Sequence, residues 1–141
     1  MPASPKYLSQ AAFPEPNSRS PAAGARGMAL LKGTLDVLVL KALSWGPMHG
    51  FEITSWLEER SGGRIGVTDA ALLQALHRME ERELVTAEWG VTRNGRRARY
   101  YRLTAKGRAT LRADSAAIVD DVAALTAVLA ARRPEPEGEI P

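Results

Sequence analysis

The most informative part of the sequence is the stretch from Leu84 to Thr104, LVTAEWGVTRNGRRARYYRLT. Residues 84–90 and 98–104 within it are rich in β-branched and aromatic side chains, which predicts two short strands. The pair Asn94-Gly95 lies between them and readily adopts the positive φ angles that a tight turn needs. We therefore expect a β-hairpin that carries arginines on its tip and on its returning strand.

The positive charge of this hairpin is concentrated. Residues 91–108 hold seven of the 19 lysines and arginines of the chain and no Asp or Glu, whereas the net charge of the 141 residues is only +3. A run of charge is often no more than a solvated surface. On a hairpin that follows several helices it indicates contact with DNA phosphates, and one arginine could also enter a narrow minor groove.

Three helical patterns precede the hairpin. The first covers residues 35–45, with Thr34 as the expected N-cap, and it is apolar nearly all round, so it must be covered on more than one side. The second covers residues 51–60, with an expected buried stripe of Phe51, Ile53, Trp56 and Leu57.

The third helix is predicted over residues 69–82. An i, i+3, i+4, i+7 spacing fixes its inward face as Leu72, Ala75, Leu76 and Met79. The opposite face carries Ala70, Gln74, His77 and Glu81, with Leu73 and Arg78 on its flanks. Gln74 on that face can pair bidentately with adenine in the major groove, although a plain surface glutamine is an equal alternative.

A final helix is expected over residues 105–133. Spacings of four and three along it form a coiled-coil seam of Leu111, Ser115, Ile118, Val122, Leu125 and Leu129. The seam either packs back onto the first helix or joins two copies of the chain, and we favour dimerisation. The Pro-rich segments 1–27 and 134–141 are expected to be disordered, and Met28 is a candidate translation start.

Composition narrows the classes of function. The chain has no cysteine and only two histidines, His49 and His77, neither in a recognisable triad or metal spacing, so we expect no catalytic site, no metal and no cofactor. Apolar runs fall well short of the ~20 residues that span a bilayer, so a cytoplasmic protein with no membrane contact is expected. His49 is expected to support the turn before the second helix.

The order of three helices, a basic hairpin and a long helix is that of a winged helix-turn-helix. The expected fold is mainly α with a two-stranded β wing, followed by a C-terminal dimerisation helix. The stretches LLKGTLDVLVLKAL (30–43), GPMHGFEI (46–53), LLQALHRMEER (72–82) and AEWGVTRNGRRARYYRLTAKGR (87–108) resemble the PadR family of bacterial winged-helix transcriptional regulators.

The resemblance implies a homodimer, joined by its C-terminal helix, that represses a nearby operon. It places a DNA-binding domain at residues 28–104 and the dimerisation helix at 105–133. One departure is visible, because Ala71, Leu73 and Gln74 stand where the family usually has a hydroxyl residue, a tyrosine and a proline.

The expected partners are a palindromic double-stranded operator and a second copy of the chain. The residues expected at the DNA are Gln74, His77, Arg78, Arg93, Asn94, Arg96, Arg97 and Arg99. Those expected at the dimer interface are Leu111, Ile118, Val122, Leu125 and Leu129.

Two alternatives stay open from the residues alone. A winged-helix module that binds proteins and has lost DNA recognition would account for the altered third helix. The three tryptophans, Trp45, Trp56 and Trp89, are expected to be core or packing residues, and the alternative is an aromatic pocket for a small-molecule effector of unknown identity.

Overall fold

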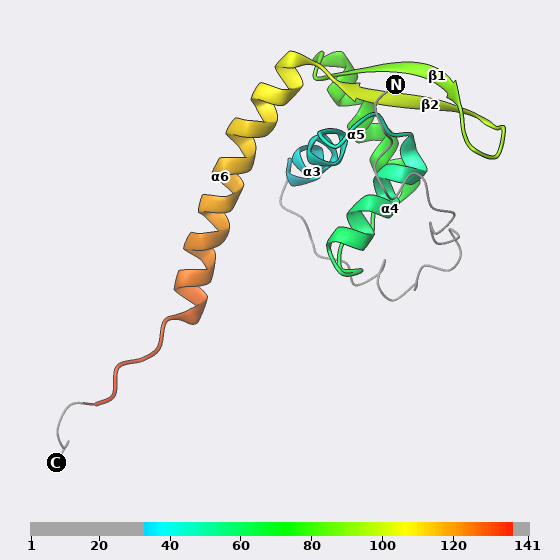
Figure 1. Ribbon diagram of the computed structural model, residues 1–141. Coiled ribbons are helices and arrows are strands. Elements are labelled where there is room, and N and C mark those ends of the chain that lie inside the picture. Colours follow the sequence, from blue (N-terminus) through cyan, green and yellow to red (C-terminus); the bar gives the residue numbers. More distant parts are fainter. Residues whose placement is uncertain (1–32, 137–141) are drawn as a thin grey trace.

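The computed structural model describes residues 33–136, which form four helices and one two-stranded antiparallel sheet (Figure 1). The elements follow the chain as α3 Thr34–Leu43, α4 Gly50–Arg60, α5 Asp69–Glu81, β1 Val85–Val91, β2 Arg97–Leu103 and α6 Ala105–Ala130. This order confirms the mainly α-helical winged-helix fold with a two-stranded wing and a long C-terminal helix. The expected tail 1–27, the candidate start Met28 and residues 137–141 lie outside the described residues.

Helix α3 is covered by its own chain. It contacts α4, α5, β2 and α6, and Val39, Leu40 and Ala42 on it are almost completely buried. The cover on more than one side that its apolar sequence demands is therefore supplied within the chain. The start of the helix differs from the prediction, because Thr34 is the first helical residue and Gly33 takes the cap position with a φ of 87°. Glycine adopts this left-handed conformation without a Cβ clash.

The inward face of α5 is as predicted. The Thr68 side chain caps the helix by accepting a hydrogen bond from the Ala71 N–H at 3.1 Å. The buried residues are Leu72, Ala75, Leu76 and Met79, and they join the core made by α3, α4 and the base of the hairpin. On α4 the expected stripe is buried except for Phe51, which is half-buried, while Glu52 is unexpectedly buried at 6% exposure.

The hairpin has the expected antiparallel pairing, with each strand displaced by about one residue from its predicted bounds. Val85 pairs with Leu103, and Val91 pairs with Arg97. The connecting loop is closed by the Thr92 N–H, which donates to the Arg96 carbonyl at 2.8 Å. Of the pair Asn94-Gly95 only the glycine adopts a positive φ, at 81°, so the turn is longer than the two-residue type that this pair favours.

The base of the hairpin is tied to the turn before α4. The Met48 N–H donates to the Tyr101 carbonyl at 3.2 Å, and the Tyr101 N–H donates back to the Met48 carbonyl at 2.9 Å. Both side chains are buried. The wing therefore rises from the helical core as a fixed element and not as a free loop.

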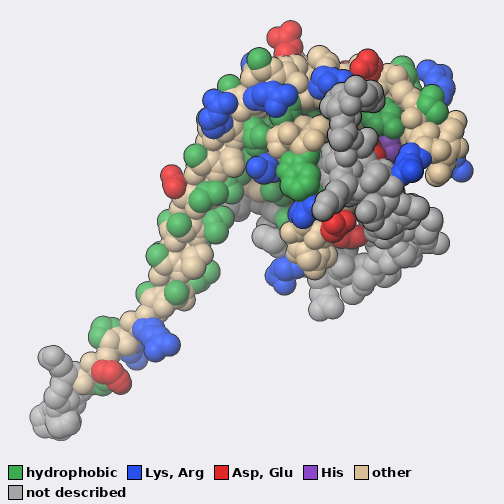
Figure 2. Space-filling view, in the orientation of Figure 1, with side chains coloured by type: hydrophobic (Ala, Val, Ile, Leu, Met, Phe, Trp, Pro, Cys, Tyr) green, Lys and Arg blue, Asp and Glu red, His purple; other side chains and the backbone are tan. Residues whose placement is uncertain are grey.

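Helix α6 begins one residue after β2 and leaves the domain as a projecting rod (Figure 1). Its start is pinned, because a methyl group at Gly107 would collide with the carbonyl oxygen of Leu84. Leu111 packs against the core, whereas every residue from 119 to 136 is exposed. Figure 2 shows hydrophobic side chains along this projecting helix.

Candidate nucleic-acid interface

The outward face of α5 is exposed and chemically mixed. Gln74 and His77, both expected at the DNA, lie on the surface, as does Ala70. Leu73 beside them is 52% exposed, a large apolar side chain that the domain does not cover. The face can therefore offer one amide for hydrogen bonding and apolar groups that fit thymine methyls.

Arg78, on the flank of the same helix, is already paired. Its Nη2 lies 2.7 Å from Asp36 Oδ1, and its Nε lies 3.4 Å from Oδ2. This hydrogen bond raises the pKa of the Arg78 guanidinium above its ordinary value. A phosphate contact by Arg78, which the sequence predicts, would have to compete with the Asp36 carboxylate.

The tip of the wing carries three of the predicted residues, Arg93, Asn94 and Arg96, and all three are exposed. The Arg96 N–H donates to Thr92 Oγ1 at 3.2 Å, which fixes the backbone where the loop returns to the sheet. The tip contains no acid. Its charge therefore suits a phosphate backbone.

One face of the wing is turned toward α5. Direct cross-strand partners share a face of a sheet, and Arg99 is paired with Trp89. On that face the Arg99 Nη2 lies 2.9 Å from Oε2 of Glu80 on α5, and the Arg97 guanidinium lies 4.6 Å from the centre of the Trp89 ring. The two arginines that share a side, as strand alternation predicts, thus have different partners.

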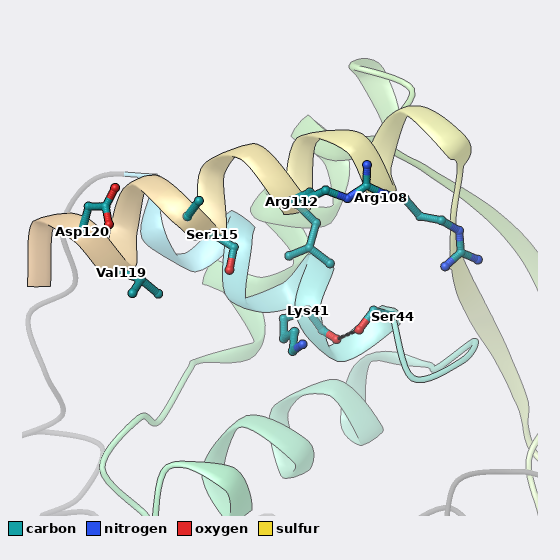
Figure 3. A pocket seen from close by; sticks show the side chains of 9 residues that line it. Lys41, Ser44, Arg108, Arg112, Ser115, Val119 and Asp120 are labelled. Carbon is teal, nitrogen blue, oxygen red and sulfur yellow. Dashed lines mark hydrogen bonds between the residues drawn. The ribbon is translucent and has the colours of Figure 1, made fainter. Parts of the chain in front are cut away.

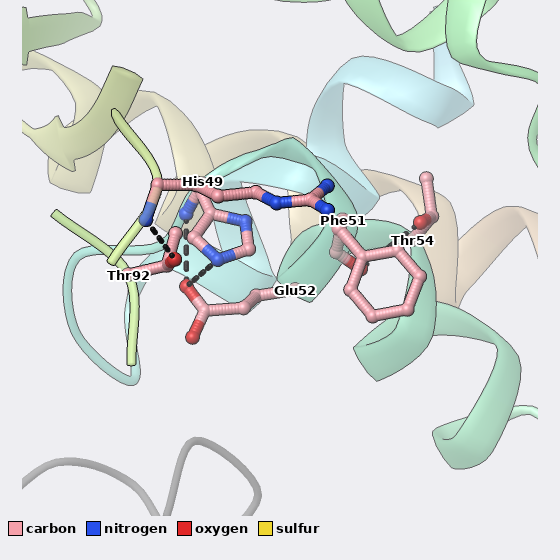
Figure 4. A network of polar contacts seen from close by, with 6 residues as sticks. His49, Phe51, Glu52, Thr54 and Thr92 are labelled. Atoms are coloured by element: carbon pink, nitrogen blue, oxygen red, sulfur yellow. Dashed lines mark hydrogen bonds and ion pairs between the residues drawn. The ribbon is translucent and has the colours of Figure 1, made fainter. Parts of the chain in front are cut away.

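The opposite face of the wing packs on the start of α4. The Tyr100 ring stands edge-on to His49, with centroids 5.3 Å apart, and leaves no space for a side chain at Gly90. His49 occupies the N-cap of α4, so it does support the turn before that helix. Its backbone N–H donates to Glu52 Oε1 at 3.0 Å, and its ring Nε2 lies 3.5 Å from the same oxygen (Figure 4).

Burial perturbs both of these titratable groups. It raises the pKa of Glu52 to about 7, against the opposing effect of the hydrogen bond from the His49 backbone, and it lowers the pKa of His49. Both shifts favour neutral side chains, as expected for groups taken out of water. The pKa of the Glu52 carboxyl, at the junction between wing and helices, therefore lies close to neutral pH.

The residues predicted for a dimer interface divide into two groups along α6. Leu111 and Ile118 are half-buried, and Leu111 packs on the core of its own domain. Val122, Leu125 and Leu129 are 54%, 53% and 84% exposed. The first part of the seam therefore packs back on the domain, and the second part is left uncovered.

An open groove of about 610 Å³ lies between α3 and the first half of α6 (Figure 3). Its lining is basic and partly apolar: Lys41, Ser44, Arg108, Leu111, Arg112, Ser115, Ala116, Val119 and Asp120. No tryptophan lines it, so it gives no support to an aromatic effector pocket.

Of the three tryptophans, expected as core or packing residues, one lies in the core, while Trp45 packs edge-on to it and Trp89 lies under Arg97. Trp56 is buried, but Trp45 and Trp89 are 45% and 61% exposed. Sequence reasoning missed Asp36 and Glu80 as partners of predicted DNA-contacting arginines. Strand alternation could have placed Trp89 beside Arg97 and Arg99, whereas nothing local links Asp36 to Arg78, 42 residues away.

Within residues 33–136 no group of His, Cys, Asp and Glu is arranged to hold a metal ion. The same part of the chain has no helix of the length and apolar character needed to cross a bilayer.

Comparison with known proteins agrees with this geometry. Residues 39–113 match the model of the PadR-like family of transcriptional regulators. The chain belongs to this family. The match contains α4, α5 and the whole wing, and it ends in the first turns of α6.

Solved structures of other family members have the same fold. A PadR-family regulator from Eggerthella lenta is 26% identical, with a TM-score of 0.59 over 72% of this chain and 86% of that one. A PadR-like regulator from Bacillus cereus is 21% identical, with a TM-score of 0.63 over 74% of this chain and all of that one.

Two further relatives are a more distant solved structure and a protein without a described function. PadR of Bacillus subtilis, solved in complex with operator DNA, is 19% identical, with a TM-score of 0.52 over 77% of this chain and 53% of that one. An uncharacterised protein from Lysinibacillus sphaericus is 28% identical over 82 residues, which are 58% of this chain and 75% of that protein.

Proposed function

We propose that this chain is a homodimeric DNA-binding repressor of transcription, without catalytic activity, that places α5 in the major groove and the wing on the flanking backbone. The observation that carries the proposal is the acid-free wing tip, where Arg93, Asn94 and Arg96 are exposed on a regulator of the PadR-like family. The family's Bacillus subtilis member, solved with operator DNA, supports the same kind of partner here.

The proposed division of labour follows from charge. The wing arginines neutralise phosphates and release counterions, which supplies affinity without sequence preference. Gln74 and His77 on α5 face the bases, and Gln74 carries the direct reading of one adenine. Arg97 and Arg99 add to the positive charge of the wing, and a phosphate contact by Arg78 or Arg99 would compete with Asp36 or Glu80.

The proposed dimer uses the exposed end of the α6 seam. Val122, Leu125 and Leu129 would bury apolar surface against a second copy. The two-fold axis of that dimer would present two identical DNA-binding domains to the operator. On this view residues 28–104 form the DNA-binding domain and residues 105–133 the dimerisation helix. The operator is an inverted repeat with half-sites about one helical turn, ~10 bp, or a multiple of that apart.

A protein-binding module is the second candidate, and one observation favours it. Leu73 is a large exposed apolar residue on the face of α5 that would otherwise read DNA, next to Ala70 and Ala71. Exposed apolar groups of this kind also suit a protein partner.

Selection from a random pool of duplex DNA at physiological salt, followed by sequencing, tests the proposal. An enriched inverted repeat is the expected result. Recovery of no motif, with affinity no greater than for bulk DNA, would reject the regulator function and leave the protein-binding module.

A further inference from the structure

Trp89 is the most exposed aromatic side chain that the structure records on the wing, and its exposure needs a reason. The indole is 61% exposed in the middle of β1, and Val91, two residues further along the same face, is 66% exposed. An indole is amphipathic, and surfaces that expose one are commonly covered by a partner.

The ring is not left to move freely. The Arg97 guanidinium lies over it, 4.6 Å from the ring centre, a distance typical of a cation–π contact. Arg97 is also exposed, so N–H groups of its guanidinium remain available to donate to a negatively charged oxygen. Trp89 and Arg97 thus form one preassembled unit, with an apolar ring and a set of charged donors.

The charges around this unit select the kind of partner. The face that carries Trp89, Val91, Arg97 and Arg99 has no acidic residue on either strand. Glu88, the one acid of the hairpin strands, lies on the opposite face, where its Oε1 is 3.9 Å from Arg102. A partner that combines negative charge with apolar surface is therefore favoured over a neutral or basic one.

The position of the face is also suitable. Arg99 links it to Glu80 on α5, at 2.9 Å, so it is turned toward the helix that we assign to the major groove. A duplex seated on α5 would present the sugar–phosphate edge of its minor groove to the wing. Deoxyribose rings supply the apolar surface there, and the phosphates alternate with them.

We propose that Trp89 is itself a DNA-contacting residue, which packs its ring on a deoxyribose at the edge of the minor groove while Arg97, stacked on it, donates to the adjacent phosphate. This inference rests on the proposed DNA binding. It assigns to the wing an apolar contact in addition to the charged contacts of its tip.

The test compares three variants on a fluorescein-labelled, mixed-sequence duplex long enough for two half-sites. Trp89→Ala should weaken binding about tenfold, as expected when a ring face loses its burial, and Trp89→Phe should weaken it only about two- to threefold. Trp45→Ala is the matched control, because Trp45 is also exposed and also has an arginine, Arg60, at 4.6 Å from its ring. It should bind as the wild type does, once circular dichroism has established that all variants are folded.

A second readout separates direct contact from an indirect effect on the wing. In a Trp45→Phe background, addition of the duplex should quench the exposed tryptophan emission, and the further change Trp89→Phe should abolish that response. A double-mutant cycle of Trp89→Ala with Arg97→Ala should be clearly non-additive, because the two residues act as a unit.

The outcomes are distinguishable from those of the proposed function. If the wild type binds the duplex and Trp89→Ala binds it with the same affinity, the inference is overturned and DNA binding stands. The same conclusion follows if the wild type binds and its tryptophan emission does not change. Absence of wild-type binding to any duplex overturns both.

Discussion

The guanidinium of Arg78 and the carboxylate of Asp36 join α5 to α3 through two contacts, Nη2 to Oδ1 at 2.7 Å and Nε to Oδ2 at 3.4 Å. The acid is mostly covered, at 14% exposure of its side chain, whereas half of the arginine side chain faces solvent. The pair holds a positive charge beside the proposed reading face and neutralises it at the same time.

Release of this arginine should strengthen DNA binding. In Asp36→Asn the Arg78 side chain is free to reach a phosphate, so affinity should rise a few-fold and the slope of log K against log salt should steepen by about one. The cost in stability should be small, ~0–1 kcal/mol, as for other partly exposed ion pairs.

The matched control is Asp121→Asn, which removes the same charge from an exposed position on α6. Titrations of both variants at several salt concentrations check the prediction. Equal steepening in the two variants would mean that only net charge matters and that Arg78 makes no new contact.

The wing arginines should not be equivalent. Arg96→Ala, at the exposed tip, should reduce the salt slope by about one and weaken binding to all sequences alike. Arg99→Ala should change the slope by less than about half as much, because Glu80 already neutralises Arg99. If Arg99→Ala has the larger effect on the slope, the Glu80 pair must break when DNA binds.

Gln74→Ala should alter specificity and leave the salt slope unchanged. Loss of a bidentate pair to adenine should relax preference at one position in each half-site by ~1–3 kcal/mol. Parallel selections with the wild type and the variant measure this directly. Identical motifs would show that α5 reads the groove by shape alone.

A charge on the exposed end of the α6 seam should separate the dimer. Leu125 is 53% exposed in the single chain, so Leu125→Glu should leave the domain folded while it places an unpaired charge in the interface. Light scattering should report a monomer, and DNA affinity should fall with it. Ala124→Glu, one residue away on a different side of the helix, is the control and should remain a dimer.

The buried Glu52 should make stability depend on pH. Its pKa is about 7 in the fold against an ordinary value of 4.5, so the folded chain binds more protons than the unfolded chain between these values. The contribution is fully present below 4.5 and is lost as the pH rises through 7. Glu52→Gln should remove this loss and stabilise the protein by about 1–3 kcal/mol at about pH 8, with little difference near pH 4.

Denaturant unfolding of both proteins at several pH values checks this prediction. The lowered pKa of His49 acts in the opposite sense, since stability is lost as the pH falls below 6.5, but it is present in both proteins and largely cancels in the difference. A difference that does not change with pH would mean that folding leaves the pKa of Glu52 at its ordinary value.

Local patterns predicted the elements well. The inward face of α5 follows from helical spacing, and the hairpin follows from two β-rich runs around Asn94-Gly95, with a displacement of about one residue at its ends. These features depend on neighbours in the chain. The order of these elements along the chain predicted the winged helix-turn-helix, and the family resemblance agreed with it.

The partners of the charged side chains could not be predicted in the same way. Asp36 and Arg78 meet only because α3 and α5 cross, and burial of Glu52 depends on how the wing closes over the start of α4. The elements that cover α3 could not be assigned for a related reason. Part of that cover comes from the first half of α6, a contact between segments about 70 residues apart in the chain, which helical periodicity does not reveal.

The single residue between β2 and α6 makes the long helix a lever on the wing. Its 26 residues extend ~39 Å, so a rotation of ~10° at Thr104 displaces the far end by ~7 Å. In a dimer joined at those far ends, the helices are held and each winged-helix domain would rotate instead. The rotation would change the distance between the two wings. A molecule that bound in the groove between α3 and α6 and widened it would then change the distance between the two wings. Half-sites of the original spacing could no longer be bound by both DNA-binding domains at once.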